Sequence, residues 1–428
     1  MAGARYTSPL AEAIAHDLLE RFLRYVRIET QSRRDREQSP STPGQLELGR
    51  LLVGELKEIG LADATLDGNG YVTATLPPSD GGGAQAPVIG LIAHLDTSPD
   101  APGAGVEPIV HRNYTGGTLD LPRGGTRLDP DAVPELRGKL GHDIVTSSGD
   151  TLLGADDKAG IAEIVAAVAH LSAHPELPRP TLRIGFTPDE EIGEGASLFD
   201  IASFGAKCAY TLDGSELGEV QDETFSAVEA ILTFTGVDVH PGQATGKLVS
   251  ALRLASRTIA ALPTDSLTPE STSGRAGFIH PYELSGTPSR AILRAIVRDF
   301  DDQLLESHVE RLKRTARETV AAEPRAHLKI DVRSQYRNMR RYLDKFPRVT
   351  AAAEEAIRAE GIEPIRVPIR GGTDGSLLSE RGLPTPNIFT GGHDYHSVRE
   401  WASVQDMAAA SATVVRLAAV WAKATADP

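Results

Sequence analysis

Residues 88–93 constrain the fold more than any other part of this 428-residue chain. They are apolar or glycine without a break, whereas a strand with one face in water alternates apolar and polar side chains. Such a run is typical of a strand buried on both faces, which requires helices on both sides of its sheet. We therefore expect a layered α/β domain around this strand.

Helices and apolar strands alternate around that run. An i, i+4 apolar stripe predicts a helix around residues 18–26. A second helix begins after Thr42, a typical N-cap, has Pro43 in its first turn and ends at Gly60. Further helices are predicted over 159–171 and near 196–202, and further strands over 182–186 and 209–212. This alternation indicates an α/β sheet.

The pattern changes after Asp213. Residues 227–234 and 290–297 alternate with period two, which suits a sheet with one wet face. Helices are predicted over 248–261 and 302–322, and a last strand over 326–332. This order resembles an α+β, ferredoxin-like unit.

The α/β pattern resumes after about residue 336. It predicts a helix over 350–359, strands over 365–369 and 387–389, and a final helix from about Val404. We therefore predict one discontinuous α/β domain, residues 1–224 and 337–428, interrupted by an inserted lid domain, residues 225–336.

Composition excludes several kinds of partner. The net charge of −15 repels phosphate backbones and anionic lipid headgroups, so we expect neither nucleic acid nor a membrane surface as partner. The most apolar stretch, 408–422, contains Arg416 and is too short to span a bilayer. The single cysteine, Cys208, rules out a cysteine-based zinc cluster and suits a reducing compartment. Because the N-terminus does not resemble a secretory signal, we expect a cytoplasmic protein.

Acidic and imidazole groups follow the ends of the predicted strands, where open α/β sheets place their ligands. Each segment alone has a plain structural explanation, such as a helix N-cap, a solvated acidic turn or an Asp-Gly turn. Their coincidence at one sheet edge predicts a binding site. The segments are His94 to Asp96, Gly154 to Lys158, Thr187 to Glu191, Asp213, and Gly391 to His396.

The residue types point to metal. Histidine and carboxylate ligands without thiolate suit zinc in a hydrolytic site, with manganese or cobalt as alternatives. A pair of ions about 3.5 to 4 Å apart needs a bridging carboxylate and shares a water that needs a base. Spacing alone does not choose between His393 and His396 as a ligand.

These residues resemble the co-catalytic dizinc exopeptidase family, which includes aminoacylase-like deacylases and bacterial carboxypeptidases. Five motifs resemble its tripeptide aminopeptidases more closely, and the similarity runs from about Leu19 to the final helix. The motifs are LLGADDKAGI (152–161), TPDEE (187–191), RDF (298–300), IRGGTDG (369–375) and PNIFTGG (386–392). The resemblance implies a mixed-sheet zinc exopeptidase catalytic domain with an inserted ferredoxin-like lid.

The resemblance also implies the ligands of two zinc ions. One ion would be held by His94, Asp156 and Asp213, and the second by Asp156, Glu191 and His396.

The same resemblance assigns two further acids. Glu190 is implied as the general acid/base and Asp96 as the residue that orients His94. His396 is favoured over His393, because the family's histidine lies four residues after the second glycine.

The inserted domain carries three implied substrate-binding residues. His240 would stabilise the oxyanion, and Arg298 and Asn338 would bind the far end of the peptide. A guanidinium binds a terminal carboxylate in bidentate geometry. The alternatives are a surface salt bridge for Arg298 and an ordinary loop histidine for His240.

The implied activity is that of a metallo-aminopeptidase that releases the N-terminal residue of short peptides, tripeptides above all, by zinc-activated water attack with Glu190 as general base. A dizinc dipeptidase or an N-acyl amino acid deacylase would share every metal ligand. A peptide-binding module without catalysis and a structural protein are further alternatives. Family members often pair through the lid domain, so the resemblance allows a homodimer. No function is assigned to residues 1–15.

Overall fold

The computed structural model describes residues 5–80 and 83–424. It divides the chain into two compact units. The first comprises Met1–Asp222, Met339–Val367 and Thr373–Pro428, and the second Glu223–Asn338 and Pro368–Gly372. The boundaries predicted from the sequence differ from this division by two residues at each junction and in residues 368–372. That short segment joins the second unit because the Phe225 N–H donates to the Ile369 carbonyl over 3.0 Å.

The first unit is built on an eight-stranded mixed sheet, in the order β1-β2-β8-β3-β9-β16-β10-β15. Strand β3 lies between β8 and β9 and is parallel to both. Every residue of β3 is buried, which confirms the prediction for the apolar run. The strands are β1 (Thr65–Leu66), β2 (Val72–Leu76), β3 (Ile89–His94), β8 (Leu182–Thr187), β9 (Cys208–Leu212), β10 (Glu219–Gln221), β15 (Ile365–Arg366) and β16 (Asn387–Ile388).

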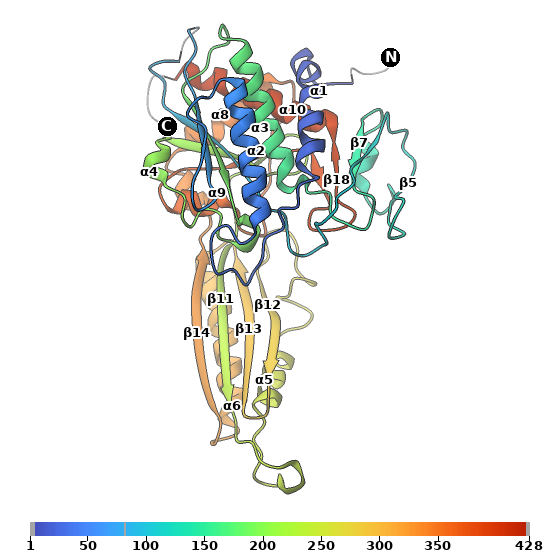
Figure 1. Ribbon diagram of the computed structural model, residues 1–428. Helices are drawn as coiled ribbons and strands as arrows, with labels where there is room; N and C mark the ends of the chain where they lie inside the picture. Colours follow the sequence, from blue (N-terminus) through green and yellow to red (C-terminus); the bar gives the residue numbers. More distant parts are fainter. Residues whose placement is uncertain (1–4, 81–82, 425–428) are drawn as a thin grey trace. The chain divides into compact units, whose positions relative to one another are not determined.

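Helices cover both faces of this sheet. Helix α1 packs on α3 and α10, and α10 packs on α8 (Figure 1). Leu91 of β3 belongs to the large core that these helices form, whereas Ile92 belongs to a smaller cluster with Phe199 and Phe204. Neighbouring residues of β3 therefore face different cores, as the period of a strand requires. The helices are α1 (Pro9–Tyr25), α2 (Pro43–Ile59), α3 (Ala155–Ala173), α4 (Ile201–Phe204), α7 (Arg340–Leu343), α8 (Pro347–Ala359), α9 (Asp374–Glu380) and α10 (Val404–Ala422).

Local signals set the ends of two of these helices. Gly60 ends α2 in the left-handed region, at φ 106°, where glycine has no steric cost. The prediction of a helix near 196–202 is wrong over its first half. Residues 195–198 form turns, and α4 begins after Asp200, whose side chain accepts the Ser203 N–H at 3.0 Å. An N-cap at that position places the helix start after it.

A second, four-stranded sheet of the first unit was not predicted. Its order is β17-β18-β7-β4, and its strands are β4 (Ile109–His111), β7 (Ile144–Thr146), β17 (Gly392–His393) and β18 (Trp401–Ser403). Strands of two or three residues are too short to produce a periodic pattern. Between β4 and β7 the chain forms the strand pair β5 (Leu119–Asp120) and β6 (Arg127–Leu128) and the 3₁₀ turn η1 (Pro134–Gly138).

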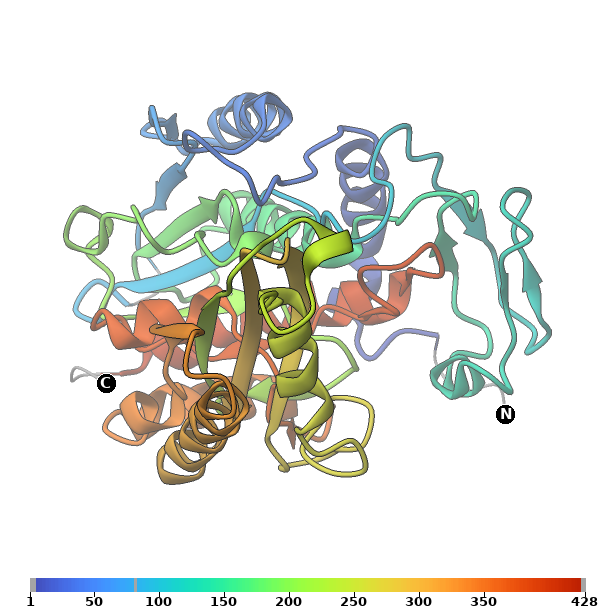
Figure 2. The same ribbon diagram turned by 90° about the horizontal axis from the view of Figure 1, so that it is seen from below.

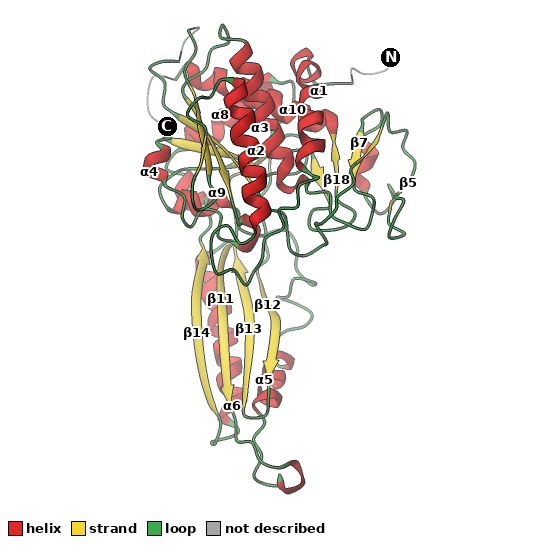
Figure 3. Cartoon of the chain, viewed as in Figure 1, coloured by secondary structure: helices red, strands yellow, loops and turns green. Residues whose placement is uncertain are grey.

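The second unit is an antiparallel sheet in the order β12-β13-β11-β14, drawn in yellow in Figure 3. Helices α5 and α6 pack against it in one core, and Figure 2 shows both on one face. With the chain order β11-α5-β12-β13-α6-β14, this is the predicted ferredoxin-like arrangement. The elements are β11 (Ser226–Thr235), α5 (Ala251–Ala260), β12 (Phe278–Gly286), β13 (Arg290–Asp299), α6 (Asp302–Ala321) and β14 (His327–Tyr336), with the 3₁₀ turn η3 (Pro241–Gln243).

Among residues 5–80 and 83–424, none of the helices combines the length and the apolar character that a membrane crossing demands.

A buried hydroxyl joins three elements of the first unit, and its loss tests their packing. Tyr210 on β9 donates to the Val349 carbonyl at 2.8 Å and accepts from the Trp421 indole at 2.9 Å. Tyr210→Phe leaves a buried donor and a buried acceptor unpaired, so we expect a loss of about 1–3 kcal/mol in unfolding free energy. Urea unfolding followed by tryptophan fluorescence measures it, because both tryptophans lie in the first unit.

Tyr6→Phe is the control, because the Tyr6 hydroxyl makes no hydrogen bond to any described residue. An equal shift in both variants would contradict the role given to the Tyr210 hydroxyl.

Candidate metal centre

The Asp156 carboxylate faces two histidines at once. Its Oδ1 lies 2.8 Å from Nε2 of His94, and its Oδ2 lies 3.2 Å from Nε2 of His396. Oε2 of Glu191 lies 3.0 Å from the same His396 nitrogen, and Oδ1 of Asp213 lies 3.8 Å from the His94 nitrogen. The first unit thus brings together all five residues that the sequence suggested as metal ligands.

His94 ends strand β3 and is 3% exposed. Its Nδ1 lies 3.0 Å from the Asp96 backbone carbonyl and 3.4 Å from the Asp96 carboxylate. Since a carbonyl only accepts, Nδ1 carries a ring proton toward Asp96, and Nε2, which faces Asp156, is the nitrogen that can bind a metal once its own proton is lost. The resulting tautomer is the one that a metal ligand needs.

The Asp96 carboxylate also holds the turn that carries Glu190 and Glu191. It accepts the N–H of Glu190 at 2.9 Å and that of Glu191 at 3.1 Å. These are the first residues of the 3₁₀ turn η2 (Glu190–Ile192), where free N–H groups favour a negative charge. Asp96 therefore connects the end of β3 to both glutamates.

Asp189, the first acid of that acidic run, is not solvated. It is fully buried, has a positive φ of 60°, and accepts hydrogen bonds from the Ser41 and Gln45 side chains. Arg36 lies 3.3 Å away. Its neighbours therefore supply the positive charge and the donors that a buried carboxylate requires.

Asp157 and Asp156 have different partners, although they are adjacent. Both Asp157 oxygens accept backbone N–H groups, from His94 at 3.0 Å and from Gly160 at 3.2 Å. Asp157 thus has the local role of a helix-start residue, and Asp156 turns toward the imidazoles.

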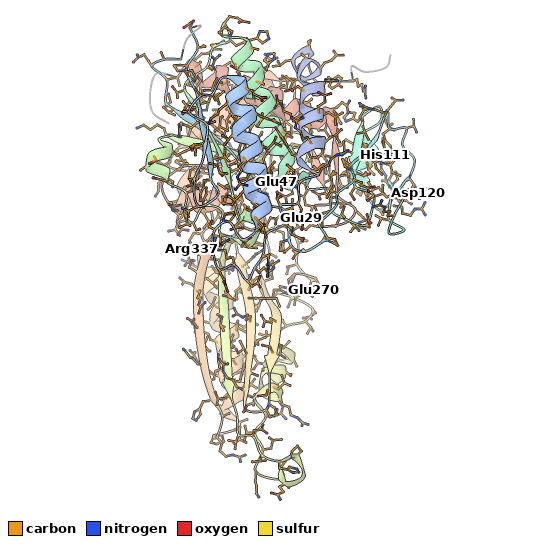
Figure 4. The ribbon with its side chains drawn as sticks, viewed as in Figure 1. Glu29, Glu47, His111, Asp120, Glu270 and Arg337 are labelled. Atoms are coloured by element: carbon orange, nitrogen blue, oxygen red, sulfur yellow. The ribbon has the colours of Figure 1, made fainter. Side chains whose placement is uncertain are left out.

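A buried lysine follows this pair. The Lys158 ammonium donates to the Ile28 carbonyl at 2.7 Å. Burial lowers the pKa of Lys158 to about 7, against the opposing field of Glu400, Asp96 and Glu29. Glu29 lies beside the first turn of α2 (Figure 4).

Two residues at the start of α9 contact the site, and the sequence did not assign them a role. The Asp374 N–H donates to Oε1 of Glu190 at 3.2 Å, and the Thr373 hydroxyl donates to Oδ2 of Asp213 at 3.2 Å. The sequence does contain a partial indication of this role, because Thr373 has the side chain of an N-cap and lies in a motif that carries the family resemblance. The contact between Thr373 and Asp213 depends on the tertiary structure, so the sequence could not indicate it.

The electrostatics of the cluster favour added positive charge. Burial, together with the neighbouring Asp156 carboxylate, raises the pKa of Asp213 to about 8 and that of Glu191 to about 7. Burial also raises the pKa of Glu190 well above its usual value. Against their own burial, contacts with the carboxylates raise the pKa of His94 well above its ordinary value and that of His396 to about 11. Protons therefore supply the positive charge when no metal does.

The donor set fits metal cations. His94, Asp156 and Glu191 each place one ligand atom within 4.8 Å of the others, and so do His94, Asp157 and Asp213. Oε1 of Glu191 is buried without a hydrogen-bond partner among the described residues. An oxygen of this kind has a lone pair with which it can bind a cation.

His393 lies in a different environment from His396. Its ring stacks on Trp401 at 4.1 Å, and burial lowers the pKa of His393 to about 4. It could join Glu216 and Asp406 as ligands, but the Lys139 ammonium already lies 2.6 and 2.8 Å from those carboxylates. His396, by contrast, has a 42% exposed side chain and contacts Asp156 and Glu191.

Comparison with known proteins decides the family. Residues 125–420 match the peptidase family M20/M25/M40. The chain belongs to this family. This chain is 44% identical to peptidase T of Bacillus subtilis (strain 168) over 403 residues, which cover 94% of this chain and 98% of that protein. It is 45% identical to peptidase T of Vibrio parahaemolyticus over 406 residues, 95% of this chain and 98% of that protein.

Solved structures agree on the fold of this M20 peptidase. The aminopeptidase PepT from Bacillus cereus matches with a TM-score of 0.72 at 23% identity, over 96% of this chain and 99% of that one. A Bacillus subtilis protein described as a dinuclear metal-binding peptidase from the M20 family matches with a TM-score of 0.62 at 15% identity, over 96% and 98%. The predicted fold class and the resemblance to tripeptide aminopeptidases are confirmed.

The three predicted substrate-binding residues belong to the second unit. His240 is exposed, and its Nδ1 accepts the Gly242 N–H at 3.2 Å. The Asn338 amide accepts from the Thr224 N–H at 3.3 Å and donates to the Phe300 carbonyl at 3.1 Å. Its side chain thus has a structural role within the unit, and the substrate role of both residues stays a prediction.

Arg298 retains an unused donor within its unit. Its guanidinium lies about 6 Å from the rings of Phe278 and Tyr336, and Nη1 donates to the Arg370 carbonyl at 3.3 Å. Its Nε is buried and has no hydrogen-bond partner among the described residues. A carboxylate ligand would satisfy such a group.

The metal affinity of the site should rise with pH. A metal ion must displace the protons on the ligating nitrogens of His94 and His396 and those held by Glu191, with a pKa of about 7, and Asp213, with a pKa of about 8. Both acids become protonated as the pH falls from 8 to 6, so the apparent affinity should fall by about tenfold per pH unit for each proton displaced.

Competition with a chelating dye across this range measures the slope, and calorimetry in buffers of different ionisation enthalpy counts the protons. An affinity independent of pH between 6 and 8 would contradict the electrostatic account.

Proposed function

We propose that this chain hydrolyses the first peptide bond of short peptides, tripeptides above all, in a site that holds two zinc ions and uses Glu190 as general base. One observation carries the proposal: each oxygen of the Asp156 carboxylate faces a different imidazole, as a ligand shared by two ions requires. The similarity to peptidase T proteins over nearly the whole chain supports the choice of peptide and of bond.

The proposed ligands divide between the two sides of Asp156. His94 and Asp213 complete one zinc site, and Glu191 and His396 the other. Nitrogen and carboxylate ligands suit zinc, with manganese and cobalt as weaker alternatives. When bound, two such ions would acidify a shared water and polarise the scissile carbonyl.

The residues of this chain supply the proton chemistry. The Glu190 carboxylate accepts the proton of the attacking water and delivers it to the leaving amine. Burial raises the pKa of Glu190 well above its usual value, and the Asp374 N–H at 3.2 Å orients its carboxylate. Asp96 fixes the same glutamate through its backbone N–H. These contacts support the proposed role of Glu190 in both proton transfers of each turnover.

We further propose that Arg298 binds the terminal carboxylate of the substrate and that His240 stabilises the oxyanion. The unused Nε of Arg298 supports the first role. The role of Asn338, a homodimer formed through the lid domain, the catalytic-domain and lid-domain boundaries, and the cytoplasmic location stay predictions from the sequence.

A dipeptidase or an N-acyl amino acid deacylase would use the same metal ligands. A free tripeptide, its N-acetylated form and a dipeptide separate the three activities, because an aminopeptidase requires the free amine. Preference for the free tripeptide supports the proposal, and preference for the acetylated form would replace it with deacylation.

Glu190→Gln should abolish turnover without removing metal. The amide cannot accept the water's proton, so we expect kcat to fall by about 10²–10⁴-fold. Elemental analysis of the purified variant should find the metal content of the wild type. Loss of both metal ions from this variant would show that Glu190 is a ligand and would contradict its assignment as the general base.

Arg298→Ala should raise the KM for a tripeptide by about 10–100-fold, the range expected when a charged hydrogen bond is lost. It should change the KM for the matching tripeptide amide far less, since the amide has no terminal carboxylate. Arg294→Ala is the matched control on the same strand, because Arg294 pairs with Glu229 at 2.7 Å. Equal effects on acid and amide substrates would contradict the role of Arg298.

A further inference from the structure

Glu400 is a buried carboxylate that no part of the proposed chemistry uses. It is 1% exposed and lies between His396 and strand β18. Its Oε2 accepts the backbone N–H groups of Leu153 at 2.7 Å and Gly154 at 2.8 Å. Its Oε1 accepts the N–H of Asp156 at 3.0 Å. Three charge-assisted hydrogen bonds therefore join this carboxylate to the turn that carries Asp156.

The turn that Glu400 binds needs such a support. Gly154 lies in the left-handed region at φ 82°, and Asp156 and Asp157 both have non-helical backbone angles before α3 continues. The N–H groups of this segment have no partners in a regular helix, so they need an acceptor from elsewhere. Glu400 supplies that acceptor, and the direction of the Asp156 side chain depends on the backbone it holds.

The segment that carries Glu400 also carries His396. The Glu400 N–H donates to the Ser397 carbonyl at 3.3 Å, and the Ser397 hydroxyl donates to the Asp394 carbonyl at 2.7 Å. Immediately after Glu400, Trp401 of β18 pairs with Thr146 on β7. A short, hydrogen-bonded segment therefore separates His396 from Glu400 and ends in a sheet.

These contacts close a ring. Glu400 holds the Asp156 backbone, the Asp156 Oδ2 faces His396 at 3.2 Å, and His396 leads back along the chain to Glu400. We propose that Glu400 is a positioning residue for the metal centre: it fixes the Asp156 carboxylate at the distance from His396 that a shared pair of ions requires. This inference rests on the proposed role of Asp156 as the shared ligand.

The chemistry of the carboxylate makes the inference testable. Glu400→Gln keeps the shape but offers one acceptor oxygen in place of two, and its NH₂ group faces at least one N–H of the turn. A donor opposite a donor leaves both unpaired in a buried place, so the turn must shift. Removal of such supporting partners typically weakens metal affinity by about 10–100-fold.

The control is Glu360→Gln. Glu360 is also 1% exposed, lies in the first unit and accepts from Thr7 at 2.9 Å and Arg416 at 3.1 Å. It contacts none of the proposed metal ligands among the described residues. This variant therefore measures the general cost of neutralising a buried carboxylate.

The experiment measures zinc affinity by competition with a chelating dye, and the visible absorption of the cobalt-loaded chain, for the wild type and both variants. We expect Glu400→Gln to lose about 10–100-fold in affinity for at least one ion and to change the cobalt spectrum, and Glu360→Gln to do neither. Amide hydrogen exchange of the metal-free chains should be faster around residues 153–156 in Glu400→Gln alone.

A Glu400→Gln chain with wild-type zinc affinity and cobalt spectrum would overturn this inference and leave the proposed function standing. A wild-type chain that takes up no metal would instead overturn the proposed function. If Glu400→Gln does not fold, Glu400→Asp keeps the charge and shortens the reach. The same loss of affinity in Glu400→Asp supports the inference, and wild-type affinity overturns it.

Discussion

The Asp156 carboxylate faces an imidazole with each oxygen, and the remaining features of the site depend on this arrangement. Several other acids are buried around it, and burying carboxylates costs free energy unless positive charge compensates them. Bound protons neutralise some of these carboxylates, as the raised pKa values of Glu191 and Asp213 indicate. Metal ions would compensate the buried carboxylates more completely, so part of the net negative charge of the chain would serve to bind metal in this centre.

The sheet explains why residues distant in sequence meet at this centre. Strands β8, β3 and β9 are parallel neighbours, so their carboxyl ends lie at one edge about 4.8 Å apart. His94 ends β3, the acidic turn follows β8, and Asp213 follows β9. Helices on both faces bury these strands and hold their ends in register. The same packing that stabilises the sheet therefore positions the ligands.

Much of this could be predicted from the sequence, because strong periodic patterns report burial directly. The long helices, the buried β3 and the ferredoxin-like unit follow from such patterns. The strands β17 and β18 do not, because they are too short to show a period, yet they flank the loop that carries His396. The turn before Asp200 was misread as helix because its apolar side chains fill a core without helical spacing.

The sequence by itself determined which residue types stand at which strand ends, and through its motifs it determined the peptidase family. The family resemblance already favoured Asp156 and His396 as ligands. Only the tertiary structure showed the separate partners of Asp157 and the surroundings of His393, and gave Glu400 its partners. The physical reason is distance along the chain: Glu400 binds N–H groups 244 to 247 residues before it. A local pattern reports the burial of a side chain, whereas its partner across the fold depends on how the whole sheet assembles.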